Sequence, residues 1–130
     1  MASVRSSKNK STELSLVSLL RRFGIRGWRR GQQLEGRPDF VFRRERVALF
    51  VDGCFWHGCR EHFRLPKSRT DYWKDKISRN ESRDKQVGTL LRRQGWVVLR
   101  IWEHSLIHPG RVAKTLHRAI SGAWQRPTLR

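Results

Sequence analysis

With 130 residues, the chain is long enough for one domain with a modest hydrophobic core and too short for a second. Its 29 Lys and Arg against 11 Asp and Glu give a formal net charge of +18, which favours a polyanion, most commonly nucleic acid, over a merely solvated basic surface. No apolar run reaches the roughly 18 residues of a membrane span, and two Cys are too few for a secreted disulfide scaffold, so a cytoplasmic protein without membrane contact is expected.

The first helix is expected to begin at Ser11 or Thr12, because either residue is a good N-cap. Residues 1–10 before it are polar and basic, and we predict a flexible segment that an acidic partner would order. Glu13 lies in the first turn of this helix, where the helix dipole alone would favour a carboxylate. A short strand is expected within residues 25–30.

A predicted β-hairpin carries two carboxylates. Two β-rich runs, residues 40–42 and 47–51, flank a polar turn at residues 43–45. Asp39 opens the first run and Asp52 closes the second, so antiparallel pairing brings them to one end of the sheet. Because neighbouring carboxylates repel each other unless a cation lies between them, this arrangement suggests a divalent metal.

Residues 53–69 show no periodicity, and such a long stretch is uncommon in a compact domain unless it is functional or tied down. It contains Cys54, Cys59 and His62, and His104 follows a later predicted strand. Thiolate and imidazole groups suit tetrahedral zinc, and a Cys2His2 set would hold such a loop in place. Two unrelated buried Cys with surface His, or a small disulfide loop, are the alternatives.

A long helix is predicted from Asp71, as N-cap, to Gln94. Asp84 shares a face with apolar residues of this helix, so it needs a polar partner. His57 from the preceding loop is the candidate partner, and a structural Arg is the alternative. The apolar residues 96–102 predict a strand that lies centrally in the sheet. Pro109 then opens a final helix, and residues 125–130 form a polar tail.

Four motifs, in this order, resemble the very short patch repair (Vsr) DNA mismatch endonucleases, a branch of the PD-(D/E)xK nucleases: GRPDFVF, VALFVDGCFWHGC, TDYWKDKISRNESRD and GWVVLRIWEH. The resemblance covers residues 12–106. It implies a restriction-endonuclease-like α/β fold, with a central mixed sheet flanked by helices, in a single endonuclease domain spanning residues 11–124. It also implies a structural zinc and a Mg2+-dependent site that nicks double-stranded DNA 5′ to the thymine of a T:G mismatch.

The resemblance implies roles for individual residues of the active site. Asp39 would bind magnesium directly, together with the main-chain carbonyl of Val51. His57 would be the active-site histidine, oriented by Asp84, and Glu13 would support the site from the first helix. Some relatives carry His at the position of Asp52, which leaves the role of this second hairpin carboxylate open.

The same resemblance assigns residues to zinc and to DNA. The zinc positions fall on Cys54, Cys59, His62 and His104, with Cys and His partly interchanged. An aromatic wedge would enter the base stack beside the mismatch, although ordinary core packing is the alternative, and basic side chains would contact phosphates. The wedge residues are Phe55, Trp56 and Trp73, and the phosphate contacts are Arg37, Arg69 and Lys76.

One departure from the family concerns the N-terminus. Typical members carry a longer basic segment that clamps the opened DNA, whereas residues 5–10 here run almost directly into Ser11. A less specific nicking enzyme, acting alone or with a repair or methylation protein, is therefore the alternative function. A zinc-stabilised DNA-binding module without catalysis is a third, and the joint presence of Asp39, His57 and Asp84 argues against it. We expect a monomer.

Overall fold

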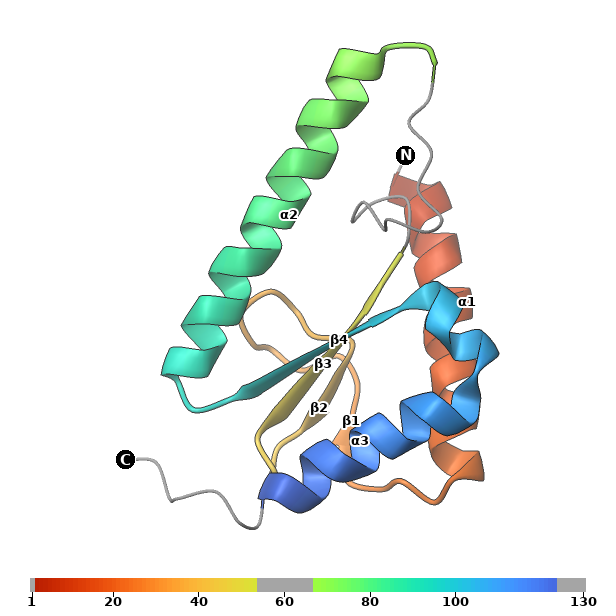
Figure 1. The fold of residues 1–130 in the computed structure, drawn as a ribbon, viewed down its shortest axis with the longest axis vertical. Coiled ribbons are helices and arrows are strands. Elements are labelled where there is room, and N and C mark those ends of the chain that lie inside the picture. Colours follow the sequence, from red (N-terminus) through yellow and green to blue (C-terminus); the bar gives the residue numbers. More distant parts are fainter. Residues whose placement is uncertain (1, 54–66, 124–130) are drawn as a thin grey trace.

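The computed structural model describes residues 2–53 and 67–123 (Figure 1). In these ranges a four-stranded mixed sheet is flanked by helices, as predicted for an α/β protein. No helix in them has the length and apolar character needed to cross a membrane. The strands are β1 (Trp28–Arg29), β2 (Phe40–Phe42), β3 (Val47–Asp52) and β4 (Val97–Trp102), and the helices are α1 (Ala2–Arg22), α2 (Thr70–Arg93), the 3-10 helix η1 (Glu103–Ile107) and α3 (Pro109–Ala123).

The sheet of the described residues has the order β1-β2-β3-β4, so β4 is an edge strand and the prediction that it lies centrally is wrong. Strands β2 and β3 are antiparallel, which confirms the predicted hairpin, and β3 and β4 are parallel. The parallel register aligns Phe50 with Arg100 and Asp52 with Trp102. Consequently, β3 and β4 finish at the same end of the sheet, the end formed by their C-terminal residues.

Two hydrophobic clusters lie on opposite faces of this sheet (Figure 1). Helices α1 and α3 cover one face, where Leu49 and Ile101 belong to the main core. The C-terminal part of α2 covers the other face, where Ala48, Phe50 and Leu91 pack together. Because side chains alternate along a strand, Asp52 and Arg100 also face α2, beyond the end of this apolar cluster.

Two predicted helix starts are wrong. Helix α1 begins at Ala2 rather than at Ser11 or Thr12, since residues 2–10 contain no Gly or Pro that would stop a helix from extending. Helix α2 begins at Thr70, and its cap residue is Arg69 in a left-handed conformation (φ 55°). Asp71, predicted as N-cap, lies in the first turn, where a carboxylate is favoured by the helix dipole.

Candidate active site

Asp39 lies at the end of the loop before β2, and its Oδ2 accepts a hydrogen bond of 2.7 Å from the Val51 backbone N–H. This bond joins the start of β2 to the end of β3, as the hairpin pattern predicted. The N–H and C=O of one strand residue point to the same side of the strand. The Val51 carbonyl is therefore directed to the side on which the Asp39 carboxylate lies.

The pKa of Asp39 is raised from 3.8 to about 6, mainly by burial of the carboxyl group. The hydrogen bond from the Val51 N–H opposes this rise, the negative charges of Glu13 and Asp52 add to it, and the positive charge of Arg100 lowers the pKa. The anionic form of Asp39 is thus disfavoured by partial desolvation and by repulsion from other carboxylates. A bound cation would relieve both the desolvation and the repulsion. The donor set of Asp39 and the Val51 carbonyl fits a hard, oxygen-binding ion such as Mg2+.

The raised pKa of Asp39 makes the stability of the metal-free protein depend on pH. Because the folded state binds this proton more tightly than the unfolded state, the associated stability is present below pH 3.8 and is lost as pH rises through about 6. Asp39→Asn should therefore stabilise the metal-free protein at pH 8, by up to about 3 kcal/mol, and change it little near pH 4. Urea unfolding at both pH values measures this, with the exposed Asp75→Asn as control. An equal effect of Asp39→Asn at both pH values would contradict it.

Arg100 connects two further carboxylates to the same region. Its Nη1 lies 2.9 Å from Oδ1 of Asp52, its Nη2 lies 3.6 Å from Oδ1 of Asp84, and its guanidinium carbon lies 4.2 Å from the centre of the Phe50 ring. Asp84 was predicted to pair with His57, which lies outside the described residues, so that pairing stays a prediction. The alternative partner, an arginine, is present. Sequence reasoning did not single out Arg100, although a charged residue in the apolar run of residues 96–102 was an available signal.

Glu13 on α1 lies close enough to Asp39 to influence its ionisation, and it forms an ion pair of 3.6 Å with Arg30. Both carboxylates line a cleft of about 840 Å3, together with residues 31–38. Arg37, a predicted phosphate contact, is exposed in this loop and lines the same cleft. The structure thus places an arginine and two of the predicted acidic residues around one opening.

The loop that carries Asp39 depends on Gly36. This glycine has a φ of +74°, and a Cβ built on it would collide with Cγ1 of Val87 on α2 and lie 3.1 Å from Cγ2. Gly36→Ala should destabilise the fold by about 1–3 kcal/mol through overpacking, in addition to backbone strain, and should lower activity by displacing Asp39.

Gly31→Ala provides the matched control, because Gly31 has a similar φ of +65° with no atom within 4 Å of the added Cβ. Thermal unfolding and a cleavage assay on both variants separate the collision from the strain. If the two variants lose equal stability, the contact between residues 36 and 87 does not hold the loop.

Several predicted site residues lie outside the described part of the chain: His57 of the active site, Cys54, Cys59 and His62 of the zinc set, and Phe55 and Trp56 of the wedge. His104, the fourth zinc residue, lies in η1 and stacks on Trp102 with ring centres 6.5 Å apart. Within residues 2–53 and 67–123, no group of three His, Cys, Asp or Glu is placed to hold a metal ion. The Cys2His2 zinc site therefore stays a prediction.

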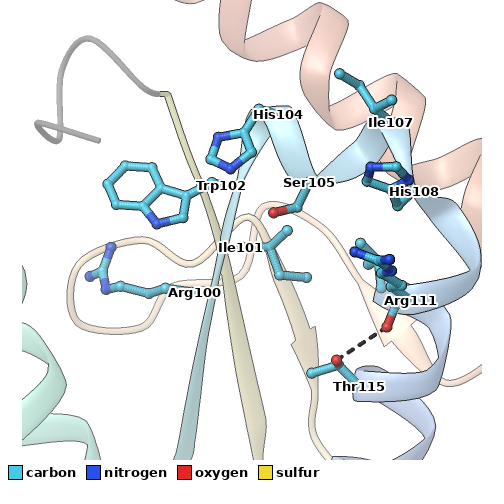
Figure 2. A pocket seen from close by; sticks show the side chains of 10 residues that line it. Arg100, Ile101, Trp102, His104, Ser105, Ile107, His108, Arg111 and Thr115 are labelled. Carbon is cyan, nitrogen blue, oxygen red and sulfur yellow. Dashed lines mark hydrogen bonds between the residues drawn. The ribbon is translucent and has the colours of Figure 1, made fainter. Parts of the chain in front are cut away.

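A second cavity, of about 560 Å3, lies beside η1 and α3 (Figure 2). Figure 2 shows Ile101 on one side of β4 and Arg100 with Trp102 on the other. His104, Ser105 and His108 line this cavity, and none of the candidate carboxylates does. The acidic cleft at Asp39 is therefore the better candidate for metal-assisted chemistry.

The N-terminal part of α2 extends past the sheet (Figure 1) and carries an aromatic and basic cluster. Trp73 meets Tyr72 edge to face at 5.0 Å, and the guanidinium of Arg69 lies 4.3 Å from the centre of the Tyr72 ring. Lys76 follows one turn later. Predicted DNA-contacting residues are thus gathered here, together with Tyr72, which sequence reasoning did not include.

Comparison with known proteins gives one family. The family profile "DNA mismatch endonuclease Vsr" matches residues 1–62. The type II nicking enzyme V.XorIIP of Xanthomonas oryzae pv. oryzae is 42% identical over 122 residues, which cover 92% of this chain and 88% of that protein. The type II nicking enzyme V.NaeI of Lentzea aerocolonigenes is 43% identical (72% of this chain, 58% of that protein), and the DNA mismatch endonuclease Vsr of Escherichia coli K12 is 38% identical (76% and 64%).

Proposed function

The chain belongs to the Vsr family of DNA mismatch endonucleases, and from this premise we propose that it nicks double-stranded DNA at T:G mismatches by Mg2+-dependent phosphodiester hydrolysis. The observation that carries the proposal is the half-buried Asp39 carboxylate at the end of the hairpin, which the Val51 N–H contacts at 2.7 Å and which shares a cleft with Glu13. Burial and the charges of Glu13 and Asp52 raise the pKa of Asp39, so a cation would favour its anionic form. Binding to DNA alone would not require acidic residues at this place in a protein of charge +18.

Asp39, Glu13, Asp84 and His57, the last of which lies outside the described residues, each have a part in the proposed reaction. Asp39, oriented by the Val51 N–H, and the Val51 carbonyl would hold Mg2+, which supplies electrostatic stabilisation of the charge that develops on the scissile phosphate. His57, oriented by Asp84, would accept a proton from the attacking water or position that water. Glu13 would support the acidic side of the cleft.

The proposed binding mode uses the cleft and the projecting end of α2. Arg37, Arg69 and Lys76 would contact phosphates without reading sequence. Phe55, Trp56 and Trp73 would enter the base stack, where a mismatched step costs less to unstack than a paired one. A zinc ion on Cys54, Cys59, His62 and His104 would hold the segment that links β3 to α2.

A second candidate function is a nicking endonuclease that does not require a mismatch, since the relatives named type II nicking enzymes carry no mismatch in their names. The two candidates share the catalytic residues and differ in whether a mismatch is needed.

Nicking rates on a matched duplex and on the same duplex with one T:G pair test the proposal. We expect the T:G duplex to be nicked at least about tenfold faster, which corresponds to about 1.4 kcal/mol of discrimination. Equal rates would replace the mismatch-specific function with the nickase that does not require a mismatch. Binding without nicking of either duplex would assign the protein to the class of zinc-stabilised DNA-binding modules.

A further inference from the structure

Arg100 is a charged residue inside the apolar run of β4, and none of the proposed reaction steps uses it. In the parallel register it lies opposite Phe50, and its side chain is on the α2 side of the sheet, as Figure 2 shows. Only 25% of its side chain is exposed. Burial of a guanidinium costs desolvation free energy unless neighbouring carboxylates offset that cost.

The compensation comes from two different elements. Asp52 on β3, with 8% of its side chain exposed, accepts a hydrogen bond of 2.9 Å from Nη1. Asp84 on α2 forms an ion pair with Nη2 at 3.6 Å. The Phe50 ring supports the guanidinium at 4.2 Å. Two separate nitrogens directed at two separate carboxylates need the planar fork of arginine, which the point charge of lysine does not reproduce.

This geometry differs from that of a phosphate contact. Both outer nitrogens of Arg100 already contact carboxylates. Arg37, by contrast, is exposed at the cleft and takes part in none of the ion pairs between described residues. Asp52, which Arg100 holds, is also close enough to Asp39 to influence its charge. Arg100 therefore acts on the site through its two carboxylate partners, in addition to the effect of its positive charge on Asp39.

We infer that Arg100 is a positioning residue whose guanidinium fixes Asp52 on β3 and Asp84 on α2, and thereby aligns the hairpin carboxylates with the aspartate that orients the active-site histidine. This inference rests on the proposed function, because it concerns the alignment of the nicking site. It also gives Asp52 a role, which is to anchor Arg100.

Nicking kinetics of Arg100→Gln, Arg100→Lys, Asp52→Asn and the double variant Arg100→Gln/Asp52→Asn test the inference on the full chain. Arg100→Gln should lower kcat about 100-fold, the effect of a misplacement of about 1 Å in an active site, while KM for the duplex changes less than about threefold. Arg100→Lys should restore only part of the loss. The double variant should have a kcat about tenfold higher than that of Arg100→Gln alone. In the single variant the buried Asp52 carboxylate has lost its arginine, and Asp52→Asn removes that negative charge.

Arg46→Gln serves as the matched control, since Arg46 is an exposed arginine at the other end of the sheet that contacts the Gln94 carbonyl, and it should keep the wild-type rate. A raised KM with unchanged kcat in Arg100→Gln would make Arg100 a DNA contact and overturn the inference. Wild-type kinetics in Arg100→Gln would also overturn it, with the proposed function intact. Absence of nicking by the wild-type protein would instead refute the proposed function itself.

Discussion

Asp39→Asn should lower the nicking rate about a thousandfold while leaving affinity for duplex DNA within about threefold of wild type. A metal ion that neutralises transition-state charge contributes several kcal/mol, and each 1.4 kcal/mol or so corresponds to a factor of ten. The substitution removes one negative charge and no positive charge, so the phosphate contacts that dominate affinity remain. Single-turnover nicking and a binding titration in EDTA measure the two quantities.

The amide that Asp39→Asn introduces would keep an oxygen for the Val51 N–H, and the neutral side chain should not weaken the fold at neutral pH, because the anionic carboxylate is the unfavourable form there. Loss of activity would then reflect chemistry rather than unfolding. Asp75→Asn, which changes an exposed aspartate on α2, is the matched control and should nick normally. Comparable nicking by Asp39→Asn and wild type would remove Asp39 from the mechanism.

The second large effect should come from zinc. We expect about one zinc per chain, and His104→Ala should lose it together with several kcal/mol of stability, since the binding free energy of a structural zinc is folding free energy. His104 lies just beyond β4, at the end of the sheet where the parallel strand β3 also finishes. Residues 54–66, which contain the other three predicted ligands, follow β3 in the sequence. Elemental analysis and thermal unfolding, with and without a chelator, measure the change.

His108→Ala is the control for this prediction, because His108 is exposed and follows η1 without belonging to the predicted ligand set. It should keep both the metal and the melting temperature. Wild-type protein that contains no zinc at full thermal stability, when purified without metal-affinity resin, would rule the site out.

The hairpin was predictable because its information is local. A three-residue strand and a six-residue strand joined by a short turn can pair in only one register if their apolar side chains are to be buried. This register brings Asp39 close to Val51. The stop of α2 was predictable for the same reason, since Gly95, with a φ of +92°, follows the C-cap residue Gln94.

Features that depend on distant residues could not be predicted from the sequence. The partners of Arg100 come from β3 and α2, and nothing in the spacing of residues 96–102 identifies either one. The close approach of Gly36 to Val87 is likewise a tertiary contact. The start of α1 was missed because capping residues such as Ser11 also occur inside helices, where no local signal separates the two uses.

The most direct test of metal-dependent nicking at Asp39 is single-turnover cleavage of an end-labelled duplex that contains one T:G pair, with Mg2+ or with EDTA, resolved strand by strand. A single cut 5′ to the mismatched thymine, on one strand, in Mg2+ and not in EDTA, is the predicted result. Cleavage at undiminished rate in EDTA, or an intact duplex under both conditions, would contradict it.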